Sequence, residues 1–173
     1  MKSPQSKPLL LAFVATMLAS LSAMALGPDQ PAPPFSLPSQ GGGSTSLAEF
    51  AGHLVYLDFW ASWCSPCRQS FPWMNEIQAK YAGRGLRVLA VNVDAKQSDA
   101  EGFLAQVPAQ FTVAFDPKGQ TPGLYQVKGM PTSFLIGSDG KVLMVHQSFH
   151  DGDRKELEAS IEAALGVHPE AKP

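Results

Sequence analysis

The chain has 173 residues, of which 45% are hydrophobic and 16% are charged, and it contains two cysteines. This length fits one domain of ordinary size, and two cysteines exclude both a disulfide-rich scaffold and a zinc site of four cysteines. The 13 basic and 15 acidic residues give a formal net charge of −2, so the chain lacks the basic field that nucleic-acid binding needs, and we expect no nucleic-acid partner.

Residues 1–25 have the composition of an export signal. Two lysines precede an uncharged, leucine-rich stretch, and Ala23 and Ala25 supply the small residues of a cleavage site. The same stretch is just long enough to remain as an uncleaved membrane anchor. Under either interpretation the rest of the chain lies outside the cytoplasm, and we expect a periplasmic domain, soluble or anchored, whose cysteines meet oxidants.

The segment that follows, residues 26–34, is rich in proline and has no periodicity, which predicts a stiff, extended leader. We expect the folded domain to cover residues 35–166 and a disordered tail to cover residues 167–173. The domain begins with a small predicted hairpin, because Phe35–Leu37 and Ser44–Leu47 flank three consecutive glycines.

The next segments predict a strand, a helix and a second strand. Leu54–Trp60 is a nearly continuous apolar run, typical of a strand buried on both faces, and it contains one acidic residue, Asp58. Phe71–Tyr81 carries apolar residues every three or four positions, as a helix with one buried stripe does, and Pro72 predicts a kink in it. Leu86–Val93 is a second buried strand, parallel to the first through a right-handed crossover.

A shorter helix and strand are predicted after this unit. Ser98–Glu101 has the spacing of a capping box, which would open a helix with Phe103, Leu104 and Val107 on its buried side. Phe111–Phe115 has the composition of a short strand.

The last elements are a hairpin and a helix. Thr132–Ile136 and Val142–Val145 flank an Asp-Gly pair, a strong signal for a turn between antiparallel strands. The final helix is predicted from about Arg154 to Leu165, with Asp151 and Asp153 as candidate caps. Together these elements predict an α/β domain with a central mixed sheet flanked by helices.

The predicted chemistry lies at Cys64 and Cys67, which follow the first buried strand and open the helix. The unpaired N–H groups and the positive dipole end of a helix favour a thiolate in its first turn, so Cys64 is the predicted nucleophile. Cys67 lies one turn further in, where burial should keep the thiol protonated until it resolves a mixed disulfide. The alternative is a structural disulfide, although such a short loop contributes little stability.

Asp58 is the other candidate catalytic residue. A carboxylate in so apolar a strand is costly to ionise, which should raise its pKa and let it exchange protons near neutral pH. If it lies beneath the cysteines, Asp58 can take the proton from Cys67 as that thiol attacks. The alternative is a core aspartate whose oxygens accept hydrogen bonds from backbone donors.

Three separated motifs make the chain resemble a known family: Leu57–Cys67 (LDFWASWCSPC), Pro72 and Gly129–Thr132 (GMPT). They resemble those of the thioredoxin superfamily and, within it, of the exported TlpA/ResA-like thiol:disulfide oxidoreductases. The resemblance implies a thioredoxin-like fold, in which the helix and strand between Ala95 and Phe115 are the insertion typical of the exported branch.

The resemblance also implies a substrate-binding surface. Pro131 would be in the cis form and lie opposite the cysteines, where it would block metal capture. The backbone of Met130 would pair with an extended client segment beside Cys64. Trp63, next to Cys64, is a further candidate contact for the client.

Two positions depart from relatives of this type. Ser70 stands where some ResA-type relatives carry a proton-active glutamate, so Asp58 would serve alone. Thr132 follows Pro131 where the branch that matures cytochrome c carries an acidic residue. Dedicated reduction of apocytochrome thiols is therefore not signalled.

We accordingly expect a thiol:disulfide oxidoreductase that needs no cofactor and no metal. It would exchange its Cys64–Cys67 disulfide with the cysteines of client proteins, acting as a reductase with electrons from a membrane thiol donor. A motif does not fix the direction, so a disulfide-forming oxidant is one alternative. The other is a periplasmic copper-binding or copper-delivery protein, because His146 and His150 lie near Met144 and copper favours thiolate, thioether and imidazole ligands.

Overall fold

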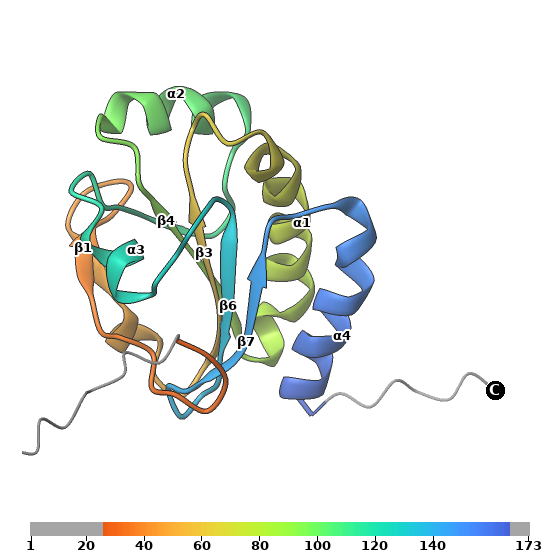
Figure 1. The fold of residues 1–173 in the computed structure, drawn as a ribbon. Coiled ribbons are helices and arrows are strands. Elements are labelled where there is room, and N and C mark those ends of the chain that lie inside the picture. The colour runs from red at the N-terminus through yellow and green to blue at the C-terminus, as the bar shows by residue number, and fades with distance from the viewer. Residues whose placement is uncertain (1–25, 167–173) are drawn as a thin grey trace, which may run out of the picture.

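A computed structural model describes residues 26–166 of the chain (Figure 1). The expected export signal (residues 1–25) and tail (residues 167–173) lie outside the described residues. Within residues 26–166, no helix combines the length and the hydrophobicity that crossing a membrane requires. The strands are β1 (Ser36–Pro38), β2 (Ser44–Ser46), β3 (Leu54–Trp60), β4 (Leu86–Asn92), β5 (Thr112–Phe115), β6 (Thr132–Ile136) and β7 (Val142–Gln147). The α-helices are α1 (Ser65–Tyr81), α2 (Gln97–Gln106), α3 (Gln120–Leu124) and α4 (Arg154–Ala164).

The central sheet has the strand order β5-β4-β3-β6-β7. As predicted, β4 is parallel to β3, in a register that pairs Leu54 with Leu86. The strands β6 and β7 run antiparallel to each other, and β6 is also antiparallel to β3. The sheet is therefore mixed, as expected. All seven residues of β3 are buried, because this strand has a neighbour on both edges and a packed layer on both faces.

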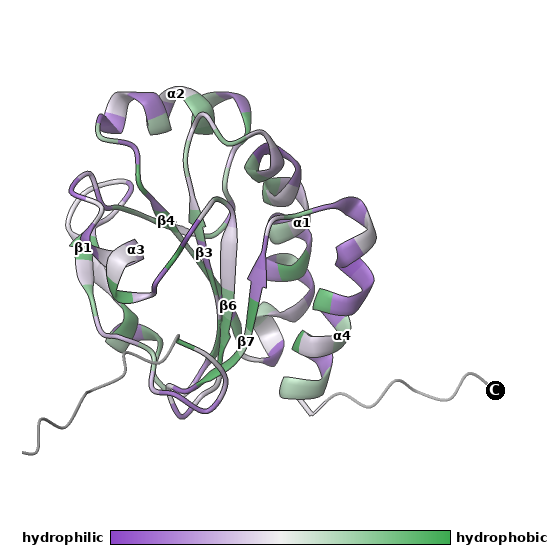
Figure 2. Cartoon of the chain, viewed as in Figure 1, coloured by the Kyte–Doolittle hydropathy of each residue, from purple (hydrophilic) through white to green (hydrophobic). Residues whose placement is uncertain are grey.

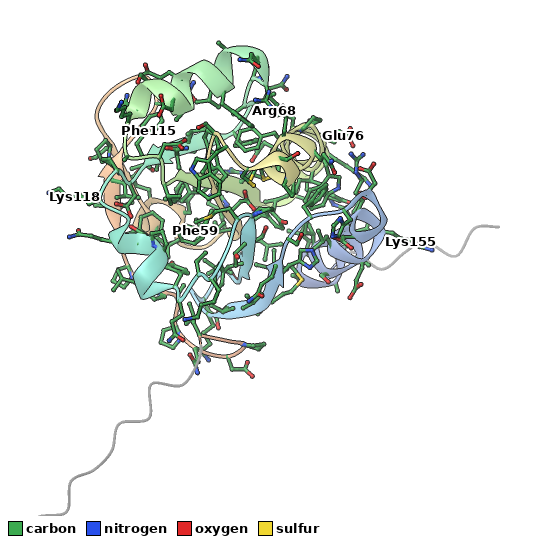
Figure 3. All side chains as sticks on the ribbon, turned by 45° about the horizontal axis from the view of Figure 1, so that its top comes forward. Phe59, Arg68, Glu76, Phe115, Lys118 and Lys155 are labelled. Carbon is green, nitrogen blue, oxygen red and sulfur yellow. A yellow bond between two sulfur atoms is a disulfide. The ribbon has the colours of Figure 1, made fainter. Side chains whose placement is uncertain are left out.

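Successive side chains of β3 point to opposite faces of the sheet, and they divide the core into two layers. Tyr56 and Trp60 face a cluster that includes residues of α1, α2 and α4, and α1 and α4 lie side by side on that side of the sheet (Figure 1). Leu57 and Phe59 face the other cluster, with Tyr125. Hydrophobic residues line the central strands, whereas α2 and α4 alternate hydrophobic and hydrophilic residues (Figure 2). In Figure 3, Phe59 points into the interior while Lys118 and Lys155 point outward.

The predicted hairpin is present as β1 and β2, which pair through Leu37 and Thr45. Ahead of it, residues 26–34 run beside the β6–β7 turn, where the backbone N–H of Asp29 donates to the carbonyl oxygen of Val142 at 2.9 Å. The helix and strand expected between residues 95 and 115 are also present, as α2 and as β5 at the edge of the sheet.

One predicted helix cap is wrong, and a second is correct in position only. Helix α2 already begins at Gln97, with Lys96 as its N-cap, so Ser98 lies inside the helix and cannot cap it. Asp153 is the N-cap residue of α4, as predicted, but its side chain makes no capping bond, and a 3₁₀ turn over Asp151–Asp153 precedes that helix. Its carboxylate instead accepts a hydrogen bond from the backbone N–H of His150 at 2.7 Å.

The buried stripe of α1 is confirmed, and it includes Trp73 together with the predicted Phe71, Met74, Ile77 and Tyr81. Pro72 lies inside this helix, and the bend expected there stays a prediction.

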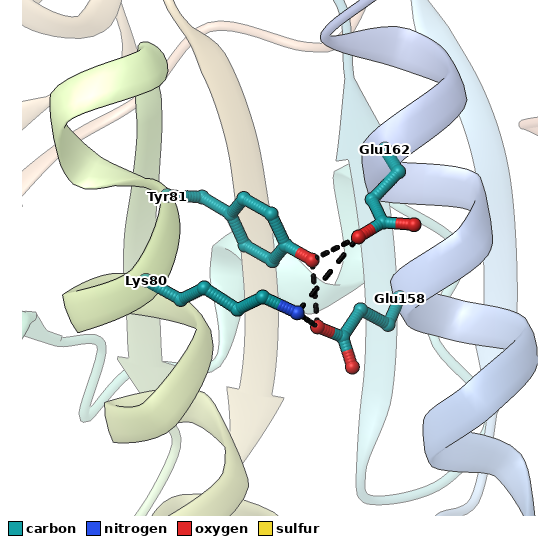
Figure 4. A network of polar contacts seen from close by, with 4 residues as sticks. All are labelled: Lys80, Tyr81, Glu158 and Glu162. Atoms are coloured by element: carbon teal, nitrogen blue, oxygen red, sulfur yellow. Dashed lines mark hydrogen bonds and ion pairs between the residues drawn. The ribbon is translucent and has the colours of Figure 1, made fainter. Parts of the chain in front are cut away.

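A polar network joins α1 to α4 (Figure 4). The hydroxyl of Tyr81 lies 2.6 Å from carboxylate oxygens of both Glu158 and Glu162, and Lys80 bonds to Glu158. The hydrogen bonds from Lys80 and Tyr81 hold the pKa of Glu158 below its ordinary value. Since a hydroxyl has one hydrogen, Tyr81 serves one carboxylate at a time, and Lys80 supplies positive charge that both carboxylates need.

Replacing Tyr81 by phenylalanine should lower the free energy of unfolding by about 1–2 kcal/mol at pH 7, because a hydrogen bond to a charged group is lost. This loss of unfolding free energy should shrink as the pH falls below the ordinary glutamate pKa. A carboxyl whose pKa is lower in the folded than in the unfolded protein stabilises the fold at higher pH, and this contribution disappears as the carboxyl becomes protonated. Urea unfolding of Tyr81→Phe and of the unaltered protein at pH 7 and at pH 3.5 measures the loss and its decrease. The control Ser160→Ala removes an exposed hydroxyl of α4 and should change the stability by less than about 0.5 kcal/mol. An equal loss at both pH values would contradict the assignment.

Candidate redox site

The cysteine pair lies where β3 has ended and α1 begins. Cys64 is the N-cap residue of α1, and Cys67 is in the first turn. The two form a disulfide with an S–S distance of 2.06 Å. The backbone N–H of Cys67 donates to Sγ of Cys64 at 3.2 Å. After reduction, this N–H and the positive end of the helix dipole favour negative charge on Cys64.

The two cysteine residues differ slightly in exposure. Cys67 is fully buried, whereas Cys64 retains 4% exposure. Trp63, the residue before Cys64, is 71% exposed. A protein from outside therefore meets Trp63 and Cys64 before it can meet Cys67.

The turn before Cys64 is held by a buried carboxylate that the sequence analysis missed. Asp94 accepts hydrogen bonds from the backbone N–H of Ser62 at 2.8 Å and from its hydroxyl at 3.0 Å. It also accepts one from the side-chain amide of Asn92 at 2.7 Å. Asp94 follows β4, and the carboxyl ends of parallel strands lie at one edge of a sheet. An aspartate directly after a buried parallel strand was the signal in the sequence.

The Met130–Pro131 peptide bond is cis, as predicted. Pro131 directly precedes β6, whose first residue, Thr132, pairs with Phe59 near the end of β3. This register places Pro131 and the cysteine pair at the same end of the sheet. Met130 is half-buried, and it lines a hollow together with Pro131 and the end of β7.

Asp58 is 1% exposed and lies on the same face of β3 as Tyr56 and Trp60, the face covered by the cluster that contains Cys67. The hydroxyl of Ser133 donates to Oδ1 of Asp58 at 2.6 Å. Oδ2 has no hydrogen-bond partner among the described residues. The alternative in which backbone donors satisfy this carboxyl is therefore wrong.

Burial raises the pKa of Asp58 from 3.8 to about 7, against the smaller lowering effect of the Ser133 hydrogen bond. The raised pKa follows from the desolvation of a carboxylate, as the sequence analysis expected. A carboxyl group with this pKa gains and loses a proton at neutral pH, which is what acid–base chemistry in this setting requires.

The hydroxyl of Ser70 donates to the carbonyl oxygen of Cys67 at 3.1 Å. This buried hydroxyl supports the first turn of α1 and supplies no ionisable group. The described part of the chain thus offers Asp58 as the acid on the cysteine side of β3.

The two histidines of the copper hypothesis lie at β7 and at the 3₁₀ turn that follows it. His146 Nε2 is 3.3 Å from a carboxylate oxygen of Asp153, while His150 is exposed. Among residues 26–166, no group of three or more His, Cys, Asp or Glu side chains is arranged to hold a metal ion. No observation of the structure favours the copper hypothesis.

Comparisons with known proteins agree with this fold and site. The AhpC/TSA family pattern matches residues 28–145. The thiol-disulfide oxidoreductase ResA of Bacillus thuringiensis subsp. konkukian is 38% identical over 112 residues, which cover 65% of each chain. ResA of Bacillus cereus strain ZK is 34% identical over 76% of this chain and 75% of its own. The chain spans about 65% of the length of the first curated relatives that it matches.

A solved structure extends the comparison to the whole domain. A protein of Chlorobium tepidum, provisionally described as the thiol:disulfide interchange protein DsbE, superposes with a TM-score of 0.80 and 62% identity. The match covers 82% of this chain and 99% of that one. The thioredoxin-like fold with its added hairpin is therefore confirmed.

Ionisation of the buried Asp58 carboxyl should lower the free energy of unfolding of the domain. Because its folded pKa lies above the unfolded value, the unfolded chain releases this proton first, and stability falls as pH rises from about 4 to about 7. Asp58→Asn should therefore raise the free energy of unfolding at pH 8, by about 4 kcal/mol at most, and much less at pH 4.

Urea unfolding of the oxidised protein at both pH values measures this difference. Asp94→Asn is the matched control. It alters a carboxylate that the turn before Cys64 uses as an acceptor, and it should destabilise the protein at both pH values. A loss of stability at pH 8 in Asp58→Asn would contradict the raised pKa.

Proposed function

The chain belongs to the AhpC/TSA family of the thioredoxin superfamily, and we propose that it catalyses thiol:disulfide exchange with client proteins through Cys64 and Cys67. The observation that carries this proposal is the asymmetry of the pair. Cys64 is at the helix N-terminus with a backbone N–H directed at its sulfur, and Cys67 is fully buried. One sulfur is thus prepared for attack on a client and the other is reserved for the second step.

The exchange runs in two steps, written for the reduced protein. The Cys64 thiolate attacks one sulfur of a client disulfide, the client S–S bond breaks, and one client thiolate leaves and takes up a proton. Cys67 then loses its proton to the Asp58 carboxylate and attacks Sγ of Cys64. The mixed disulfide breaks, and the second client thiolate leaves and takes up a proton from water. The client gains two electrons and two protons, and the Cys64–Cys67 disulfide forms.

Asp58 is proposed as the base of the second step. Its location on the cysteine side of β3 and its pKa near 7 support this role. A base with such a pKa accepts a thiol proton at the pH at which exchange takes place, and it releases that proton again without a large penalty.

The client is proposed to bind beside Cys64 as an extended segment. The backbone of Met130, which precedes the cis Pro131 and lies outside β6, would pair with it. Trp63, with 71% exposure, offers an apolar surface next to the attacking sulfur. These contacts use main-chain groups and one large ring, which suits clients of varied sequence.

We place the protein outside the cytoplasm as a reductase that receives electrons from a membrane thiol donor. The composition of residues 1–25 supports export. In an oxidising compartment the dithiol form of a reductase must be regenerated by a dedicated electron donor, because the surroundings supply no excess of thiols.

Cys67→Ser should accumulate a mixed disulfide between Cys64 and a client, because the resolving thiol is missing, whereas Cys64→Ser should form none. Mass spectrometry after mixing each reduced variant with a disulfide-bonded protein measures the adduct. Ser65→Ala, which changes an exposed residue between the cysteines, is the control and should turn over. An adduct through Cys67 in the Cys64 variant would reverse the assigned roles.

The direction of exchange follows from the reduction potential, which equilibration with glutathione measures. For a reductase we expect a value near or below about −200 mV, the range of glutaredoxins and thioredoxins. A value near about −120 mV would assign the protein as a disulfide-forming oxidant instead.

A further inference from the structure

Three polar residues form a row across the sheet, next to a row of mainly apolar residues. Asp58 on β3 pairs with Ser133 on β6, and Ser133 pairs with His146 on β7. Directly paired residues of antiparallel strands point to the same face, with Cβ atoms about 5 Å apart. The next row, Tyr56, Leu135 and Met144, packs into the buried cluster. The polar row therefore leads from the core to the edge strand.

Each end of the row has a defined environment. At the inner end, Ser133 donates its hydrogen to Asp58 at 2.6 Å, and both residues are buried. At the outer end, the side chain of His146 is 26% exposed, and its Nε2 lies 3.3 Å from Asp153. The row thus joins a buried carboxyl to a ring that reaches solvent.

Asp153 determines which ring nitrogen of His146 carries the hydrogen. The hydrogen bond from the backbone N–H of His150 holds the pKa of Asp153 below its ordinary value, so this group stays anionic. A carboxylate only accepts hydrogen bonds, which leaves the hydrogen on Nε2 of His146 and makes Nδ1 the basic nitrogen. Nδ1 is the ring nitrogen next to Cγ, so it is the one closer to the backbone of β7.

We propose that Ser133 and His146 form a proton relay that connects Asp58 to solvent. In each cycle the Asp58 carboxyl passes the proton received from Cys67 to the Ser133 oxygen, and the Ser133 hydroxyl passes its own hydrogen to Nδ1 of His146. The imidazolium, paired with Asp153, then releases a proton to water. A water bridging the Ser133 hydroxyl and Nδ1 would complete the path, since the Cβ atoms of directly paired residues lie about 5 Å apart.

The burial of Asp58 explains why its proton needs a path to water. Asp58 is 1% exposed, so it has no direct contact with bulk water from which to regain its basic form. On the β4 side it faces Ala90, which offers no polar group. Tyr56 on β3 interacts with both Asp58 and Asp153, and Cys67 belongs to the cluster on the same face of β3. At the outer end, His150 lies beside Asp153, and Arg154, the first residue of α4, pairs with Asp151. Burial raises the pKa of Tyr56, which keeps its hydroxyl neutral.

Ser133 and His146 are positioning residues for the exchange, and this inference rests on the function proposed above. The test uses the reduced protein and the aromatic disulfide 5,5′-dithiobis(2-nitrobenzoate) in a stopped-flow instrument. Attack by Cys64 releases one coloured thiolate, and attack by Cys67 on the mixed disulfide releases the second. The two phases separate the first step from the resolving step.

At pH 7 part of the molecules start with Asp58 protonated, and their Asp58 must lose this proton through the relay before it can accept the proton of Cys67. In His146→Gln we expect this part of the second phase to slow about tenfold, with the first phase unchanged. Imidazole added to His146→Ala should restore the second phase. The matched control His150→Gln changes an exposed histidine beside the same aspartate and should leave both phases unchanged. In Ser133→Ala, loss of the hydrogen bond should move the pH profile of the second phase to higher pH, because that bond lowers the pKa of Asp58.

If the second phase in His146→Gln is unchanged from pH 6 to pH 8 and the unaltered protein exchanges normally, the relay is wrong and the proposed function stands. Equal slowing of both phases would also overturn the relay, since that result indicates a structural role for His146. If the unaltered protein releases one equivalent only, the proposed function fails and the relay fails with it.

Discussion

The structure depends on the complete burial of β3. This strand pairs with β4 on one edge and with β6 on the other, and packed layers cover both of its faces. A strand enclosed in this way cannot shift its register without exposing apolar residues on both sides. Its carboxyl end is therefore fixed, and with it the turn that carries Cys64 to the start of α1. The rigid strand and the N-terminal end of the helix together set the position and the charge of the attacking sulfur.

The same enclosure gives Asp58 its chemistry. An ionised carboxylate in an apolar layer is costly, so the group retains its proton to about pH 7. Replacing it by a neutral side chain would remove a destabilising group, which places Asp58 among the residues that serve activity at the expense of stability. Ser133 moderates this cost with one hydrogen bond, while Oδ2 stays without a partner within the described residues. An unsatisfied buried oxygen is unusual in a core and is typical of a functional site.

Features that depend on neighbours along the chain can be predicted from the sequence, and those that depend on long-range contacts cannot. The strands and the α1 stripe were predicted well, because runs and periodicities of apolar residues report directly on burial. The cap at Ser98 was predicted wrongly, because a cap depends on the residue at which the chain becomes helical, and packing decides that residue. Asp94 was missed, since its partner Ser62 lies on another segment of the chain and is brought close only by the parallel pairing of β3 with β4.

The sequence by itself determined the cysteine pair, the location of that pair between a buried strand and a helix, and the acid in the middle of that strand. These features depend on neighbours along the chain, and local patterns record them. Only the tertiary structure decided which oxygen of Asp58 is satisfied, that Ser133 satisfies it, and that His146 and Asp153 continue the same row to the surface. Those relations join residues up to 95 positions apart, and they arise from strand pairing, whose register depends on the whole sheet.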